Sequence, residues 1–168
     1  AWLMMRLPFR EHPEKLPSGK VSLFGPSVCP AEKMHRYALR RNPHAPRAAE
    51  LYARFGAECG IRGDVAFCQA MLDTKVWKEA PAWAPEKTMA ARIWGVEPSA
   101  WREPEMERFV RRHFQLLLEV AGDSQPLPFC WEDLNRCWTV PGHHYGQDIL
   151  NIWRSMMEWR VPVQEEGE

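Results

Sequence analysis

Apolar residues recur at the spacing of an α-helix through most of the chain. The strongest repeat starts after Pro104 and ends at Gly122, and its i, i+3, i+4, i+7 spacing predicts a central buried helix. The residues of this face are Met106, Phe109, Val110, His113, Phe114, Leu117 and Val120. Shorter repeats predict helices over residues 30–41, 47–59, 64–73, 131–137 and 145–156. Asp64 is the expected N-cap of the third helix, and Gly60 is the expected C-cap of the second.

The helical periodicity stops between residues 74 and 102. Tryptophans crowd into this stretch and prolines interrupt it, so we expect loops or short strands there. The sequence therefore predicts an all-α fold with a small irregular or β lobe inserted after the third helix. A chain of 168 residues is long enough for one domain. We expect an N-terminal arm over 1–28, the domain over 29–160 and an acidic tail over 161–168.

Charge and targeting signals narrow the choice of partner. The chain has 22 basic and 22 acidic side chains and no basic cluster beyond Arg111 and Arg112, which argues against a nucleic-acid partner. The apolar residues 2–7 are too few to cross a membrane, and no small-residue cleavage site follows them. We therefore expect no membrane span, and we see no signal peptide.

The cysteines favour reduced thiols over a disulfide framework. There are five of them, an odd number, and none forms a CxxC pair. Cys130, Cys137, His143 and His144 come nearest to a metal cluster, but their spacing matches no standard ligand pattern. We expect buried thiols beside a surface histidine pair, with no metal and no cofactor.

Asp73 is the first candidate for chemistry. It ends the apolar third helix and directly precedes the tryptophan-rich stretch. A carboxyl group in a partly desolvated site has a raised pKa and can hold a proton for a leaving oxygen, as glycoside cleavage requires. The alternative is an aspartate that faces water.

Several blocks of sequence resemble one family of enzymes. They are AAELY at 48–52, ECGIRGDVAFCQAMLDT at 58–74, EDLNRCWTVPG at 132–142 and YGQDILNI at 145–152, with MHRYA at 34–38 upstream. Together they are similar to the glucosaminidase domain of bacterial and phage peptidoglycan hydrolases, glycoside hydrolase family 73. The resemblance covers residues 29–159 and implies a lysozyme-like fold with a cleft between the helices and the lobe.

The resemblance also implies roles for individual residues. Asp73 stands at the position of the family's catalytic glutamate, and its shorter side chain withdraws the carboxyl by about one bond length. Lys75 replaces the usual glycine, and a lysine so close is expected to lower the pKa of the acid. The lobe motif at 88–94 keeps only Ala91 and Ile93, and the loop before Tyr145 is short. These departures predict weakened activity.

Further site residues are predicted in and around the lobe. Glu97 is the preferred second carboxylate and Glu103 the other candidate, although either glutamate can equally be a solvated surface residue. The aromatic residues expected to bind the sugar are Trp77, Trp94, Trp138 and Tyr145. Indole faces pack against pyranose rings, but they also pack in cores, and the sequence does not separate these two roles for the tryptophans.

Two hypotheses of function remain open at this point. In the first, the chain is an endo-β-N-acetylglucosaminidase that cuts peptidoglycan by general-acid catalysis, with Asp73 as the acid. In the second, it is a retired enzyme that binds an N-acetylglucosamine-containing glycan or serves in phage or prophage assembly. The resemblance suggests an extracellular, cell-wall or phage-particle location, whereas the absence of a visible signal peptide and the reduced cysteines leave the location undecided.

Overall fold

The protein is built from helices around one buried helix. The computed structural model describes residues 19–81, 88–122, 129–138 and 144–163. The α-helices are α2 (Ala31–Arg41), α3 (Ala49–Cys59), α4 (Gly63–Thr74), α5 (Met89–Trp94), α6 (Met106–Ala121) and α7 (Tyr145–Glu158). Three 3-10 helices join them, η2 (Pro98–Ala100), η3 (Glu103–Glu105) and η4 (Trp131–Arg136). The described residues contain isolated β-bridges but no named strand, which confirms the all-α fold class.

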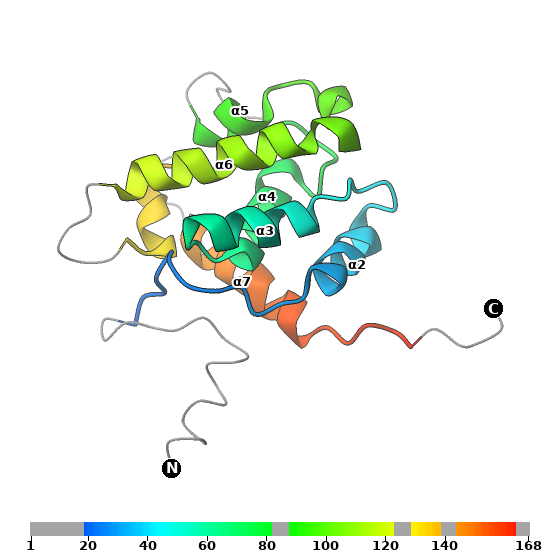
Figure 1. Cartoon of the computed structure of the whole chain (residues 1–168), viewed down its shortest axis with the longest axis horizontal. Coiled ribbons are helices and arrows are strands. Elements are labelled where there is room, and N and C mark those ends of the chain that lie inside the picture. Colours follow the sequence, from blue (N-terminus) through cyan, green and yellow to red (C-terminus); the bar gives the residue numbers. More distant parts are fainter. Residues whose placement is uncertain (1–18, 82–87, 123–128, 139–143, 164–168) are drawn as a thin grey trace, which may run out of the picture.

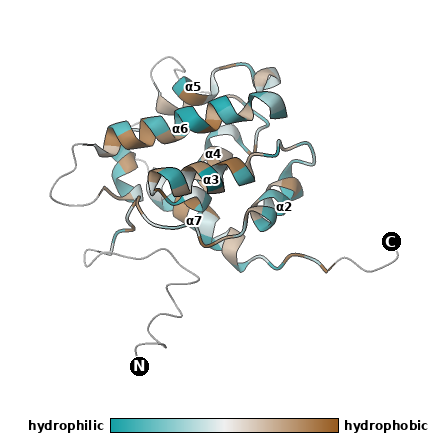
Figure 2. Cartoon of the chain, in the orientation of Figure 1, coloured by the Kyte–Doolittle hydropathy of each residue, from teal (hydrophilic) through white to brown (hydrophobic). Residues whose placement is uncertain are grey.

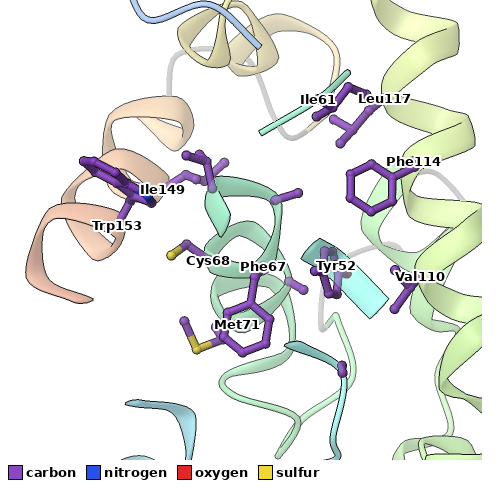
Figure 3. Close-up of a cluster of buried hydrophobic side chains, with 14 of the residues drawn as sticks. Tyr52, Ile61, Phe67, Cys68, Met71, Val110, Phe114, Leu117, Ile149 and Trp153 are labelled. Atoms are coloured by element: carbon purple, nitrogen blue, oxygen red, sulfur yellow. The ribbon is translucent and has the colours of Figure 1, made fainter. Parts of the chain in front are cut away.

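Helix α4 lies at the centre of the molecule. Figure 1 shows α6 and α5 on one side of it and α7 on the other, with α3 packed against it. Figure 3 shows Phe67 and Cys68 of α4 between Trp153 of α7 and Phe114 of α6. Ten of the 12 residues of α4 are buried, which is typical of a helix with an apolar surface all round. The helices around it are amphipathic, and hydrophobic and hydrophilic residues alternate along α6 in Figure 2.

Small residues let the helices approach α4 closely. A Cβ atom added at Gly63 would lie 2.2 Å from the carbonyl oxygen of Tyr52 in α3, so only glycine fits at the start of α4. Gly56 of α3 faces the same contact, because its added Cβ would lie 2.8 Å from Cα of Gly63. This close crossing fixes the position of α4, and with it the position of Asp73 at its far end.

Asp64 is not the N-cap that the sequence predicted. The N-cap of α4 is Arg62, and Asp64 lies inside the first turn, where it is fully buried. One carboxylate oxygen of Asp64 accepts hydrogen bonds from the backbone N–H groups of Val28 and Cys29, at 2.9 and 3.0 Å, and from Nε1 of Trp153, at 2.9 Å. Asp64 therefore ties the N-terminal segment and α7 to the start of α4.

The N-terminal segment from residue 19 lies across the helical domain. Val21 and Leu23 are buried, and isolated β-bridges join Ser22 to Cys130 and Phe24 to Ile61. These contacts place the described part of the expected arm directly on the core. Residues 1–18 of that arm, and residues 164–168 of the expected tail, lie outside the described residues.

The region after α4 differs in part from the expected loops or short strands. Residues 75–81 form turns and bends, as expected for loops, but from residue 89 the short helices α5, η2 and η3 follow one another before α6 begins. Thr88 caps α5 by accepting a hydrogen bond from the backbone N–H of Ala91 at 3.1 Å. We call residues 88–105 the α5–η3 segment. Residues 82–87, which belong to the same predicted lobe, lie outside the described residues.

Two expectations about the whole chain can be compared with the described residues. No helix among them is both long and apolar enough to cross a membrane. All five cysteines are free thiols, namely Cys29, Cys59, Cys68, Cys130 and Cys137.

Candidate active site

Asp73 lies where three separate parts of the chain meet. It is in the last turn of α4, Tyr145 is the first residue of α7, and Trp138 follows η4. The hydroxyl of Tyr145 donates a hydrogen bond to Oδ1 of Asp73 at 2.6 Å, and Nε1 of Trp138 donates one to Oδ2 at 3.2 Å. Among the described residues, each carboxylate oxygen of Asp73 therefore has one donor. We call these three residues the Asp73 group.

The packing of α7 against η4 brings Tyr145 to this position. A Cβ atom added at Gly146 would lie 2.4 Å from the carbonyl oxygen of Trp131, so glycine allows the start of α7 to touch η4. The backbone N–H of Gly146 also donates to Oδ1 of Asn135 at 2.7 Å. The blocks that carry Asn135 and Gly146 are separate in sequence, and these contacts hold them together beside α4.

The pKa of the Asp73 carboxyl lies near neutral pH. Burial raises the pKa of Asp73 from 3.8 to about 7, although the hydrogen bonds from Tyr145 and Trp138 act to lower it. Asp73 still keeps some exposed surface, unlike the fully buried Asp64. A carboxyl with this pKa is protonated in a useful fraction of molecules at neutral pH and can reach a ligand at the surface.

Lys75 does not act on Asp73 as the sequence suggested. Its ammonium group pairs with the carboxylate of Glu79 at 2.9 Å, and both side chains are exposed. The pKa of Asp73 is raised rather than lowered, because burial dominates. The ammonium group of Lys75 is thus engaged by Glu79 on the surface.

A left-handed turn follows Asp73 directly. Lys75, Val76 and Trp77 have φ angles of 48°, 56° and 58°, in the region that favours glycine. The turn is held by hydrogen bonds, since Oγ1 of Thr74 accepts from the backbone N–H of Trp77 at 2.9 Å and Nδ2 of Asn42 donates to the carbonyl of Val76 at 2.8 Å. A glycine at position 75 would suit this backbone better than lysine does.

A second layer of buried polar groups lies behind Tyr145. Nε2 of Gln69 is 3.1 Å from the hydroxyl of Tyr145, and Oε1 of Gln69 is 2.7 Å from Nε2 of His113. The other ring nitrogen of His113, Nδ1, is 2.6 Å from the hydroxyl of Tyr52. We call Tyr52, His113, Gln69 and Tyr145 the polar chain. It connects α3, α6, α4 and α7 through the middle of the core.

His113 is uncharged in this setting. Burial lowers its pKa from 6.5 to about 3, because the charged ring would lose its water. His113 is one of the residues on the face of the predicted central helix, and the sequence predicted no functional role for His113 or for Gln69. Their polarity could have identified them, because a buried amide or imidazole on a core-facing side of a helix needs hydrogen-bond partners.

The three tryptophans predicted to bind the sugar are all buried, but their surroundings differ. Trp77 and Trp94 lie in the core, 6% and 1% exposed, where their rings meet edge to face at 5.8 Å. Trp94 also stacks on Phe109 with ring centroids 5.4 Å apart. Stacking on a sugar requires an exposed ring face, and these two rings have none. Trp138 is equally buried, but its indole N–H reaches Asp73.

The predicted second carboxylates are not joined to Asp73. Glu97 is exposed at the start of η2, and Glu103 is exposed at the start of η3, where its charge acts on His35 of α2. The hydrogen bonds of the described residues connect neither glutamate with the Asp73 group. The described structure thus brings together Asp73, Trp138 and Tyr145 but not Glu97.

A cavity of about 590 Å³ lies beside the end of α4. Leu72 and Lys75 line it from α4 and the following turn, Tyr37 and Arg41 from α2, and Ile152 from α7. Asp73 is not among its lining residues, so the cavity is a neighbour of the Asp73 group and not its binding cleft.

The described residues hold no group of three or more side chains suited to a metal ion. His143 of the weighed cysteine–histidine cluster lies outside them, and His144 is exposed. The chain was also compared with protein-family models, curated proteins and solved structures, and none of these comparisons gave a match.

Proposed function

We propose that the protein is a glycoside hydrolase of the endo-β-N-acetylglucosaminidase type that acts on peptidoglycan, with Asp73 as the general acid. The observation that carries this proposal is a carboxyl of pKa about 7, partly exposed at a helix end and held by two hydrogen-bond donors. A general acid works best when its pKa lies near the working pH, and burial tunes Asp73 to that range.

The sequence resemblance supports the same proposal. Asp73, Trp138 and Tyr145 come from three of the blocks that resemble family 73, and these blocks are up to 72 residues apart. Their side chains nevertheless meet within hydrogen-bond distance. A shared site explains why the resemblance is concentrated in those blocks.

The reaction assigns a defined role to each member of the Asp73 group. Protonated Asp73 gives its proton to the glycosidic oxygen, the bond from the sugar C1 to that oxygen breaks, and the released alcohol leaves. Water then adds to C1 and returns a proton to the Asp73 carboxylate. Tyr145 and Trp138 stabilise the transient carboxylate through the two hydrogen bonds that they already donate.

The proposal gives a direction for pH. Asp73 must be protonated to donate, so activity falls as pH rises through its pKa of about 7. A carboxylic acid with an ordinary pKa would be ionised long before that.

The experiment measures reducing ends released from purified peptidoglycan. Asp73→Ala should lower the rate by ~10²–10⁴-fold, the usual contribution of a positioned acid. Asp73→Glu restores the length of the family's acid and should retain or increase the rate. Asp148→Ala is the matched control, because Asp148 is an exposed aspartate of α7 and should change nothing. Equal rates for Asp73→Ala and the wild type would reject Asp73 as the acid.

A glycan-binding module is the second candidate, and one observation favours it. Neither Glu97 nor Glu103 is hydrogen-bonded to the Asp73 group, whereas glycosidases usually act with two carboxylates. If the wild type, Asp73→Ala and Asp73→Glu release no reducing ends while the protein sediments with cell walls, the binding function replaces the hydrolase.

A further inference from the structure

The polar chain connects the Asp73 group to three helices. From Tyr52 to His113, Gln69, Tyr145 and Asp73, the successive contacts are 2.6, 2.7, 3.1 and 2.6 Å long. Tyr52, Gln69 and His113 are fully buried, and Tyr145 is nearly so. In the described part of the chain, these enclosed groups are hydrogen-bonded to one another.

The hydrogen bonds of the polar chain can be assigned one consistent order of donors and acceptors, in which each group donates to the next acceptor. Gln69 directs its amide N–H to the hydroxyl oxygen of Tyr145, so its carbonyl oxygen faces His113 and must receive a proton donor. A neutral His113 supplies that donor only when its hydrogen is on Nε2. Its Nδ1 is then an acceptor, and the hydroxyl of Tyr52 donates to it.

The opposite direction would remove the hydrogen bond to the Asp73 carboxylate. Turning the Gln69 amide over would offer its carbonyl oxygen to Tyr145, and the hydroxyl hydrogen of Tyr145 would follow it. His113 would then carry its hydrogen on Nδ1, and Tyr52 would have to find another acceptor. Asp73 could keep its contact with Tyr145 only by holding a proton itself.

We propose that Gln69 and His113 are positioning residues, which act through Tyr145 to keep its hydroxyl hydrogen directed at Asp73. This inference rests on the proposed role of Asp73 as the acid. His113 fixes the orientation of the Gln69 amide, and Gln69 fixes the hydroxyl of Tyr145. Neither residue touches the reacting atoms.

The groups around Asp73 show how this order of hydrogen bonds affects its carboxylate. Tyr145 comes from α7 and Trp138 from the chain after η4, and both donate to the carboxylate. Burial raises the pKa of Tyr52 of α3, and the nearby charge of Asp73 raises it further. On the side of α4, Lys75 pairs with Glu79. The polar chain therefore stabilises the carboxylate that remains after proton donation, against the burial that favours the neutral acid.

Two NMR measurements on the full chain test the inference. The ring nitrogens of ¹⁵N-labelled His113 should show a neutral ring with its hydrogen on Nε2 from pH 5 to 8. The carboxyl carbon of Asp73 in ¹³C-labelled protein should titrate near pH 7, and in Gln69→Met and His113→Phe it should titrate about one pH unit higher. Methionine and phenylalanine keep the volume but lose the hydrogen bonds.

A rescue variant and a control distinguish the loss of a hydrogen bond from a change in packing. His113→Gln returns an amide N–H near the place of Nε2 and should move the titration of Asp73 back towards the wild-type value. Tyr37→Phe removes a hydroxyl that bonds to Ser155, at 2.7 Å, outside the polar chain, and should leave the titration unchanged.

The outcomes distinguish this inference from the proposed function. A His113 hydrogen on Nδ1, or an unchanged Asp73 titration in both Gln69→Met and His113→Phe, would overturn the positioning role. If the titration shifts as expected but no variant releases reducing ends, the chain positions Asp73 and the hydrolase proposal fails. If peptidoglycan is cleaved, the upper limb of the pH profile should shift by the same amount as the titration.

Discussion

Around Asp73, aromatic side chains carry polar groups to one point, whereas in the α5–η3 segment they pack ring against ring. The indole N–H of Trp138 donates to Asp73, but Nε1 of Trp94 is buried and has no hydrogen-bond partner among the described residues. Trp94 instead meets Trp77, Trp101 and Phe109 through its ring. The same residue type therefore donates a hydrogen bond to a carboxylate in one region and packs ring against ring in the other.

The difference teaches which property identifies a site in this protein. Trp138 and Trp94 are equally buried, at 1% exposure each, so burial does not separate them. What separates them is the partner of the indole N–H. A buried donor that ends on a carboxylate changes the pKa of that acid, whereas a buried ring stabilises the fold through the area it removes from water.

The largest effect should come from breaking the packed region. Trp94→Ala removes a buried indole that stacks on Phe109, and we expect the free energy of unfolding to fall by ~3–5 kcal/mol. Chemical denaturation measures this change. Val96→Ala is the control, because Val96 is 53% exposed two residues away. A loss below ~1 kcal/mol for Trp94→Ala would show that the segment is not part of the core.

In the polar region, Asp73 and His113 should give the free energy of unfolding two opposite dependences on pH. Burial raises the pKa of Asp73 from 3.8 to about 7, so the folded state keeps a proton that the unfolded state loses. On its own, Asp73 therefore lowers the free energy of unfolding as pH rises from about 4 to 7, by up to ~1.4 kcal/mol per pH unit. Below pH 4 this penalty is absent.

His113 acts in the opposite direction over nearly the same range. Its pKa falls from 6.5 to about 3 on folding, so stability is lost as pH falls below about 6.5. The two groups largely cancel in the wild type. Denaturation from pH 4 to 7 should show stability rising with pH in Asp73→Asn and falling with pH in His113→Gln. Parallel curves for the two variants would contradict both assignments.

The turn between the two regions should respond to a glycine. Lys75→Gly places a residue that accepts a positive φ at 48°, and we expect it to stabilise the fold by ~1 kcal/mol. The lost surface pair with Glu79 offsets only a small part of this gain. Lys78→Gly is the matched control, because Lys78 has no positive φ and glycine there should destabilise the fold. Destabilisation by Lys75→Gly would contradict the left-handed turn.

The smallest effect is expected at Glu97. Its side chain is exposed, and Glu97→Gln should change the free energy of unfolding by less than ~0.5 kcal/mol. It should also leave reducing-end release unchanged. A loss of release as large as that of Asp73→Ala would return Glu97 to the role of second carboxylate and would extend the site into the α5–η3 segment.

The sequence predicted the helices well and the contacts among them poorly. The strong repeat before Gly122 matches α6 to within two residues, and Gly60 is indeed the C-cap of α3, with φ 75°. The irregular stretch was less readable, because α5 has only six residues and short helices leave little periodicity. Asp64 failed as an N-cap because its carboxylate is used by distant backbone groups.

Only part of the candidate site could be predicted, because some of its contacts join residues far apart in the sequence. Asp73 was found because it stands alone at the end of an apolar helix, and Tyr145 because it begins one of the sequence blocks on which the proposed resemblance rests. Gln69 and His113 are 44 residues apart, and their contact depends on how α4 meets α6. Tertiary packing decides such pairs, so local spacing could not reveal them.

The left-handed turn after Asp73 also stores backbone strain at the end of α4. Lys75, Val76 and Trp77 are L-residues in a conformation that costs about 1–3 kcal/mol each, and local unfolding releases that free energy. We therefore expect the backbone amides of this turn to exchange with solvent deuterium sooner than those in the middle of α4. Asp73 thus lies at the boundary between the most deeply buried helix among the described residues and a turn of strained backbone.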